Sequence, residues 1–151
     1  MQRFFKLDIM ITSKELRLGN YILGFYEDED GLEENEDVLF EAVCQVTSLD
    51  YSGFLDFSIY VESEHTNTEV YEKFEGIKLT KDWLNKLGFF IVETNGTFEA
   101  TLQNFRYSVQ IVKEYDGFLF CDGEKVLTNF NYVHELQNLV FILGHRELTV
   151  T

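Results

Sequence analysis

Five side chains in the sequence belong to the two residue types most typical of zinc sites, His and Cys: His65, His134, His145, Cys44 and Cys121. A zinc-binding pair on one helix face needs two histidines four residues apart, and no two of these histidines have that spacing. The cysteines are 77 residues apart, so neither has a second thiol nearby to complete a zinc site. The sequence also lacks a glycine-rich phosphate loop. We therefore expect a protein that is not an enzyme, with no catalytic residue, no metal and no cofactor.

Two metal sites stay open from residue types alone. His134, Glu135 and His145 could share a metal if other elements supplied further ligands. Asp residues also surround Gly31, as in a calcium loop, but Tyr26 then falls at the first ligand position of an EF-hand, where Asp is required. Hydrogen-bonded or surface histidines, and two reduced, buried thiols, are the simpler interpretation.

The acidic residues carry a stronger signal, because they are concentrated in one segment. The chain has 27 Asp and Glu against 12 Lys and Arg, which gives a net charge of −15. Between Leu18 and Glu72 there are 15 acidic residues and no Lys or Arg, so the remainder is neutral. Such a charge disfavours direct binding to DNA, RNA or an anionic membrane. The densest part holds the residues predicted to bind a partner: Glu27, Asp28, Glu29, Asp30, Glu33, Glu34, Glu36, Asp37 and Glu41.

The acidic run has two interpretations. It is a solvated loop that aids solubility, or it imitates a phosphate backbone and occupies the basic channel of a nucleic-acid-binding protein, with electrostatic steering toward that channel. Four lysines in the middle of the chain form either a second contact face or a solvated helix surface; these are Lys73, Lys78, Lys81 and Lys86.

Length and composition predict one globular domain over residues 1–151. The chain has 45% hydrophobic and 16% aromatic residues, far more than a disordered acidic chain contains. We divide this domain into an acidic β-rich half, 13–72, and an α+β half, 73–151. The sequence has no apolar run of signal-peptide or membrane-helix length, so we expect a cytoplasmic protein.

Hydrophobic periodicity predicts an α+β fold that consists mainly of antiparallel sheet. Alternating apolar residues indicate strands over 18–26, 38–49 and 55–61, which together would form a bent sheet or a small open barrel. Asn95-Gly96 and Asp122-Gly123 are typical of tight hairpin turns between later strands.

Capping residues place two helices in the second half. Thr80 is predicted to cap a short middle helix that ends at Gly88. Asn131 is predicted to cap a C-terminal helix that Gly144 stops, with an apolar stripe that includes Leu139 and Leu143. Residues 145–151 would add a terminal strand.

Three sequence segments resemble, in the same order along the chain, segments of a family of short uncharacterised proteins of Bacteroidetes phages and prophages. They are ELRLGNYI at 15–22, GIKLTKDWLNKLGF at 76–89 and YVHELQNLVFILGHREL at 132–148. The resemblance implies a mobile-element origin and an accessory role, and it carries over no catalytic residues. The sequence departs from the family pattern in its acidic insert after Tyr26 and in an extension before Met10, which is itself a second possible start.

Charge placement and this resemblance together favour a non-enzymatic anti-defence protein. The expected partner is a basic host protein that handles nucleic acid, such as a Cas effector or its guide-RNA complex, so the chain would be an anti-CRISPR inhibitor. Two alternatives belong to other classes: a protein that sequesters a small nucleotide signal, and a phage structural or assembly accessory. The second alternative predicts stable homo-oligomers or association with virion proteins.

Overall fold

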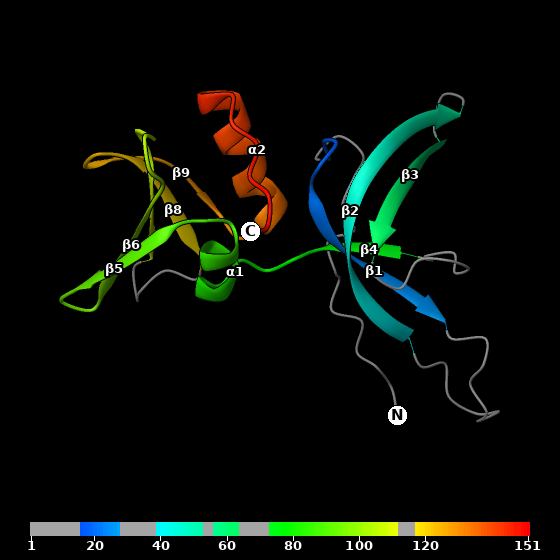
Figure 1. Ribbon diagram of the computed structural model, residues 1–151, viewed down its shortest axis with the longest axis horizontal. Coiled ribbons are helices and arrows are strands. Elements are labelled where there is room, and N and C mark those ends of the chain that lie inside the picture. The colour runs from blue at the N-terminus through cyan, green and yellow to red at the C-terminus, as the bar shows by residue number, and fades with distance from the viewer. Residues whose placement is uncertain (1–15, 28–38, 53–55, 64–72, 112–116) are drawn as a thin grey trace. The chain divides into compact units, whose positions relative to one another are not determined.

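The computed structural model describes residues 16–27, 39–52, 56–63, 73–111 and 117–151. Its α+β fold, mainly antiparallel sheet with a short middle helix and a C-terminal helix, confirms the predicted class (Figure 1). The chain divides into two compact units, Met1–Ile77 and Lys78–Thr151. In chain order the elements are β1 (Tyr21–Glu27), β2 (Leu39–Ser52), β3 (Asp56–Ser63), β4 (Lys73–Gly76), α1 (Lys81–Lys86), β5 (Phe90–Thr94), β6 (Thr97–Thr101), β7 (Ser108–Ile111), β8 (Phe118–Asp122), β9 (Lys125–Phe130) and α2 (Val133–Gly144).

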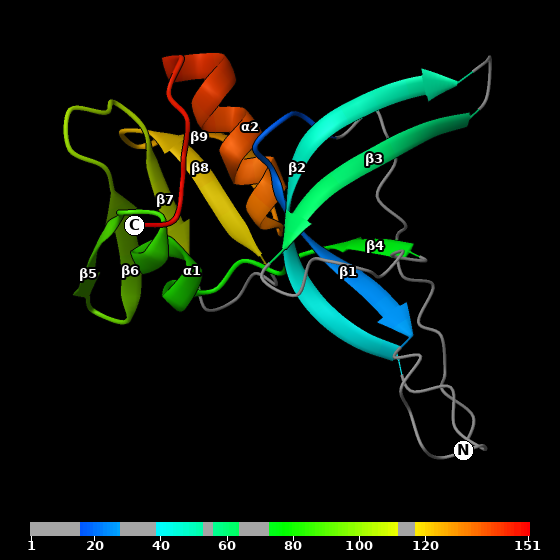
Figure 2. The same cartoon turned by 45° about the vertical axis from the view of Figure 1, so that its right-hand side comes forward.

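The first unit contains a four-stranded antiparallel sheet in the order β3-β2-β1-β4. The long strand β2 is visibly curved, with an irregularity in its pairing to β3 between Val46 and Ser48 (Figure 2). Ala42 and Cys44 are buried while Glu41 and Val43 are exposed, which confirms the predicted alternation. The four-residue strand β4, which pairs with β1, was not predicted, because it is too short for a periodic pattern.

Asn20 fixes the start of β1. Its side chain is fully buried, and its Oδ1 accepts a hydrogen bond from the Arg17 backbone N–H at 2.7 Å. The Asn20 carbonyl oxygen accepts a bond from the Val46 N–H at 2.9 Å, and Gly19 N–H donates to the Val46 carbonyl at 2.8 Å. Gly19 has a positive φ of 88°, which glycine adopts without strain. The Gly19-Asn20 pair therefore has a structural role at the start of the sheet.

The second unit contains a five-stranded antiparallel sheet in the order β5-β6-β7-β8-β9. Asn95 and Gly96 have φ values of 52° and 78°, as a two-residue type I′ hairpin requires, so the predicted turn between β5 and β6 is confirmed. The hairpin between β8 and β9 is also confirmed, although its positive φ of 61° lies at Gly123 alone. The core face of this sheet includes the buried residues Val109 and Phe120.

Helix α1 begins and ends where the capping residues predicted. The Thr80 Oγ1 accepts a hydrogen bond from the Trp83 N–H at 3.2 Å, and Gly88, with a φ of 90°, follows the helix end. Leu84 and Leu87 are buried, whereas Trp83 is half-buried, so the helix packs mainly through its leucines.

Helix α2 begins and packs differently from the prediction. Tyr132, not Asn131, is the N-cap, and Glu135 Oε2 accepts a bond from the Asn131 N–H at 3.0 Å in place of a side-chain cap. Gly144 is the last helical residue, and His145 adopts the left-handed conformation. The buried face consists of Val133, His134, Leu136, Gln137 and Val140, while Leu139 is half-buried and Leu143 is exposed.

The terminal segment 145–151 does not form the expected strand. It is held instead by hydrogen bonds to other parts of the second unit. The buried Gln137 donates from Nε2 to the Leu148 carbonyl at 3.0 Å, Arg146 Nη1 donates to the Gln103 carbonyl at 2.7 Å, and the Thr151 N–H donates to the Lys86 carbonyl at 3.0 Å. The burial of Leu148 completes this attachment.

Candidate functional site

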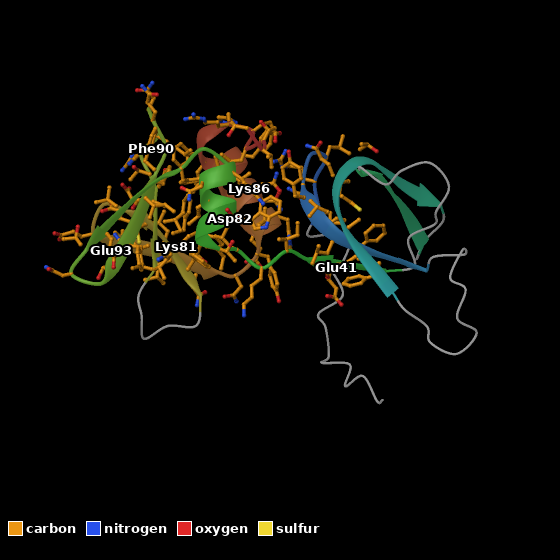
Figure 3. The ribbon with its side chains drawn as sticks, turned by 60° about the horizontal axis from the view of Figure 1, so that its bottom comes forward. Glu41, Lys81, Asp82, Lys86, Phe90 and Glu93 are labelled. Carbon is orange, nitrogen blue, oxygen red and sulfur yellow. The ribbon has the colours of Figure 1, made fainter. Side chains whose placement is uncertain are left out.

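Two of the nine predicted acidic contact residues lie within the described structure. Glu27 ends β1 opposite Leu39, and Glu41 lies in β2 opposite Phe25. The Glu41 side chain is exposed (Figure 3). It is exposed because the adjacent position, Ala42, belongs to the buried face of the strand. The other seven, Asp28, Glu29, Asp30, Glu33, Glu34, Glu36 and Asp37, lie outside the described residues.

The boundary between the two units also divides the charge. Residues 1–77 contain 18 acidic and 5 basic side chains, a net charge of −13. Residues 78–151 contain 9 acidic and 7 basic side chains, a net charge of −2. A compact unit with this excess of carboxylates sets up a negative field that attracts basic surfaces and repels phosphate.

The four predicted lysines do not belong to one unit. Lys73 begins β4 in the first unit, whereas Lys78, Lys81 and Lys86 lie in the second. Lys81 Nζ lies 3.2 Å from the centre of the Phe98 ring, a cation–π contact.

Lys86 also has local contacts. Its Nζ lies 3.1 Å from Asp82 Oδ2 and 5.2 Å from the centre of the Trp83 ring (Figure 3). Both α1 lysines therefore contact side chains of their own unit, and the Asp82 carboxylate partly neutralises the positive charge of this helix surface.

The two histidines within the described residues, His134 and His145, do not converge on a metal site. His134 is buried at the start of α2, where its ring stacks on Tyr132 with the centroids 5.8 Å apart, and His145 is exposed at the other end. A separation of 11 helical positions corresponds to roughly 16 Å, so the two rings do not share a metal ion. His65 lies outside the described residues. Among the described residues, no group of three or more His, Cys, Asp and Glu side chains could hold a metal ion.

Cys44 and Cys121 are buried thiols that do not form a disulfide. Burial raises the pKa of the Cys121 thiol, and the nearby negative charge of Glu99 raises it further. A protonated thiol is a poor nucleophile, so Cys121 is unsuited to covalent catalysis at neutral pH.

Sequence reasoning missed an exposed apolar edge at β5. Phe90 (labelled in Figure 3) and Val92 are 65% and 60% exposed. Because side chains alternate along a strand, the two lie on the same face of the edge strand β5. Strand alternation within 89–93 could have predicted part of this exposure, because neighbouring side chains face opposite sides and Phe89 is buried whereas Phe90 is exposed. That β5 is an edge strand depends on the order of five strands, which no local pattern specifies.

Comparison of the chain with protein-family models, curated protein sequences and solved structures gives no significant match. Neither α1 nor α2, the helices of the described part of the chain, has the length and apolar character needed to cross a membrane.

Proposed function

We propose that the protein is a non-enzymatic, phage-encoded anti-defence protein that binds a basic, nucleic-acid-handling host protein through its acidic unit. The partner class is a Cas effector or its guide-RNA complex, in the cytoplasm of a bacterial host. One observation carries the proposal: the compact unit 1–77 has a net charge of −13, and the unit 78–151 has a net charge of only −2.

Electrostatics explains how such a division could serve inhibition. A channel that binds RNA or DNA is lined by Lys and Arg, which also attract a carboxylate-rich surface and accelerate its encounter. Direct competition with nucleic acid follows, because the acidic unit and the phosphates need the same cations. Exposed Glu41, on the face of β2 opposite the core, is one side chain available for this contact.

The test is competition for a purified Cas effector loaded with guide RNA. The native chain should displace target nucleic acid, with an apparent affinity that falls steeply as salt rises. A variant with Glu29, Asp30, Glu33 and Glu34 changed to Lys should lose inhibition and much of the salt dependence. Glu41→Lys should weaken binding, whereas the matched change Glu124→Lys, at an exposed residue of the second unit, should not.

Unchanged inhibition by the fourfold variant would exclude phosphate mimicry. Equal effects of Glu41→Lys and Glu124→Lys would show that only the overall charge of the chain matters. Absence of binding to type II and type VI effector complexes would remove the proposed partner class for those systems.

A phage structural or assembly accessory is a second candidate function, and the exposed β5 edge favours it. An edge strand with apolar side chains is a template for pairing with another chain. This function predicts that the protein copurifies with virion components from infected cells. Mass spectrometry of purified particles tests it, and particles that lack the protein would rule it out as a structural component.

A further inference from the structure

Strand β5 forms one edge of the described sheet, and it lacks Lys, Pro and a β-bulge, although it carries one charged residue, Glu93. It pairs with β6 on one side, and it is terminal in the sheet order within the part of the chain that the structure describes. Edge strands are commonly blunted by Lys, Pro or a β-bulge. The β5 sequence, FIVET, contains no Lys or Pro, and its pairing with β6 continues over five residues without a register shift.

The opposite edge, β9, is protected. It begins with Lys125, and its pairing with β8 shifts between Phe120 and Cys121. Val126 at this edge is also exposed, to 51%, so apolar exposure alone does not distinguish the two edges. The regular backbone of β5 does distinguish them, because a partner strand needs a continuous row of hydrogen-bonding groups.

The turn at 95–96 determines which β5 backbone groups face outward. In a two-residue type I′ hairpin the flanking residues, here Thr94 and its partner, exchange both backbone hydrogen bonds. Because the pattern alternates along the strand, Val92 is also directed to β6. The backbone N–H and C=O groups of Ile91 and Glu93 therefore point to the open edge.

We propose that β5 pairs antiparallel with β5 of a second copy of this chain, about a two-fold axis at Val92. This register places Ile91 opposite Glu93 of the second copy, and the reverse, so that all the outward backbone groups of both residues are bonded. Val92 then faces Val92 of the second copy in a pair without hydrogen bonds, where side chains approach most closely. The two five-stranded sheets become continuous.

Neighbouring registers are less favourable. An axis at Glu93 would place the two Glu93 carboxylates directly opposite each other, which is destabilising. With the axis at Ile91, only the outward backbone groups of Ile91 would form hydrogen bonds between the two β5 strands. The axis at Val92 avoids like charges and places apolar Phe90 opposite Thr94 of the second copy.

Charge supports a second copy as the occupant. Two chains of net charge −15 repel each other, so self-association is least opposed through the region of lowest charge. Strand β5 belongs to the unit of net charge −2 and not to the unit of net charge −13. A two-fold interface also needs only one self-complementary surface, which the Val92 register provides. Such a dimer would present two acidic units, independently of the partner proposed above.

Sedimentation equilibrium tests the dimer on the full chain. The native protein should show a concentration-dependent mass that approaches twice the chain mass of 17.8 kDa. Val92→Lys should give the monomer mass at the same concentrations with an unchanged circular dichroism spectrum, because it places two ammonium groups opposite each other. Val126→Lys, at the other edge, should remain dimeric.

Cross-linking tests the register even if Val92→Lys fails to fold. Across the proposed axis, Val92→Cys brings two Cβ atoms within about 5 Å, near the separation that a disulfide spans. Mild oxidation should therefore yield a covalent dimer, and Val126→Cys should not; both native thiols are buried. A native chain that stays monomeric at every concentration, a dimer that survives Val92→Lys, or equal cross-linking of Val126→Cys would overturn the proposal.

Discussion

Gln137 of α2 and Leu148 of the terminal segment are joined by a buried hydrogen bond, with Gln137 Nε2 donating to the Leu148 carbonyl at 3.0 Å. Gln137 is fully buried and Leu148 nearly so. The bond satisfies a backbone acceptor of a segment with no regular secondary structure of its own. It is therefore a principal attachment of residues 145–151 to the second unit.

Replacement of Gln137 by Leu should destabilise the protein and release this segment. The substitution keeps an apolar side chain of similar size but leaves the Leu148 carbonyl without its donor, at a cost of about 1–3 kcal/mol. Urea denaturation should show this loss, and hydrogen exchange should accelerate over 145–151. The control Gln103→Leu changes an exposed glutamine and keeps the backbone carbonyl that Arg146 contacts. Equal effects of the two substitutions would argue against a specific role for the buried bond.

The Gly144–Phe105 contact provides a second prediction. A Cβ on Gly144 would collide with the Phe105 ring, so glycine is required by packing at a position whose φ is not positive. Gly144→Ala should destabilise the chain by about 1–3 kcal/mol through overpacking, despite the higher helix propensity of alanine. The double variant Gly144→Ala/Phe105→Leu should recover part of the loss. Thermal denaturation of the four members of this cycle measures the coupling, and simple additivity would refute the steric explanation.

The helix cap at Thr80 gives a third prediction, on a local feature. Thr80→Ala removes the acceptor for the Trp83 N–H and should cost about 1 kcal/mol. Thr80→Ser keeps the hydroxyl oxygen and should stay near the native stability. Chemical denaturation of both variants tests this, and equal losses would show that the Thr80 methyl group, rather than the hydroxyl, is responsible.

These residues also show which parts of the fold could be predicted from sequence. Thr80, Gly88 and the Asn95-Gly96 turn act over a few residues, so their local signals were sufficient. The terminal segment depends on Gln137, 11 residues away, and its attachment left no periodic pattern. The steric role of Gly144 depends on Phe105, which is distant in sequence, so the glycine was interpreted only as a helix stop.

The candidate site likewise has some features that the sequence predicted and others that depend on tertiary structure. Exposure of Glu41 follows from the alternation of β2, which can be read from the sequence, and the charge difference between the units needs only a count of residues. The contacts of Lys81 with Phe98 and of Lys86 with Asp82 and Trp83 were not anticipated. The Lys81 contact requires β6 to lie beside α1, a tertiary relationship. The Lys86–Asp82 spacing was visible in the sequence, since residues four apart adjoin on a helix.

The pKa of Cys121 yields the last prediction, on pH dependence. Burial, and secondarily the charge of Glu99, raise this pKa above that of the thiol in the unfolded chain, ~8.5. The folded state therefore binds the proton more tightly, so the contribution of Cys121 to stability is complete below the unfolded pKa. It is lost as the pH rises through the folded pKa. Alkylation by iodoacetamide, followed on the Cys121 peptide by mass spectrometry, should rise with pH later than for an unfolded control. Glu99→Gln should shift that rise to lower pH, because it removes a negative charge near the thiolate, whereas Glu124→Gln should not. A pH profile that Glu99→Gln leaves unchanged would show that burial alone raises the pKa.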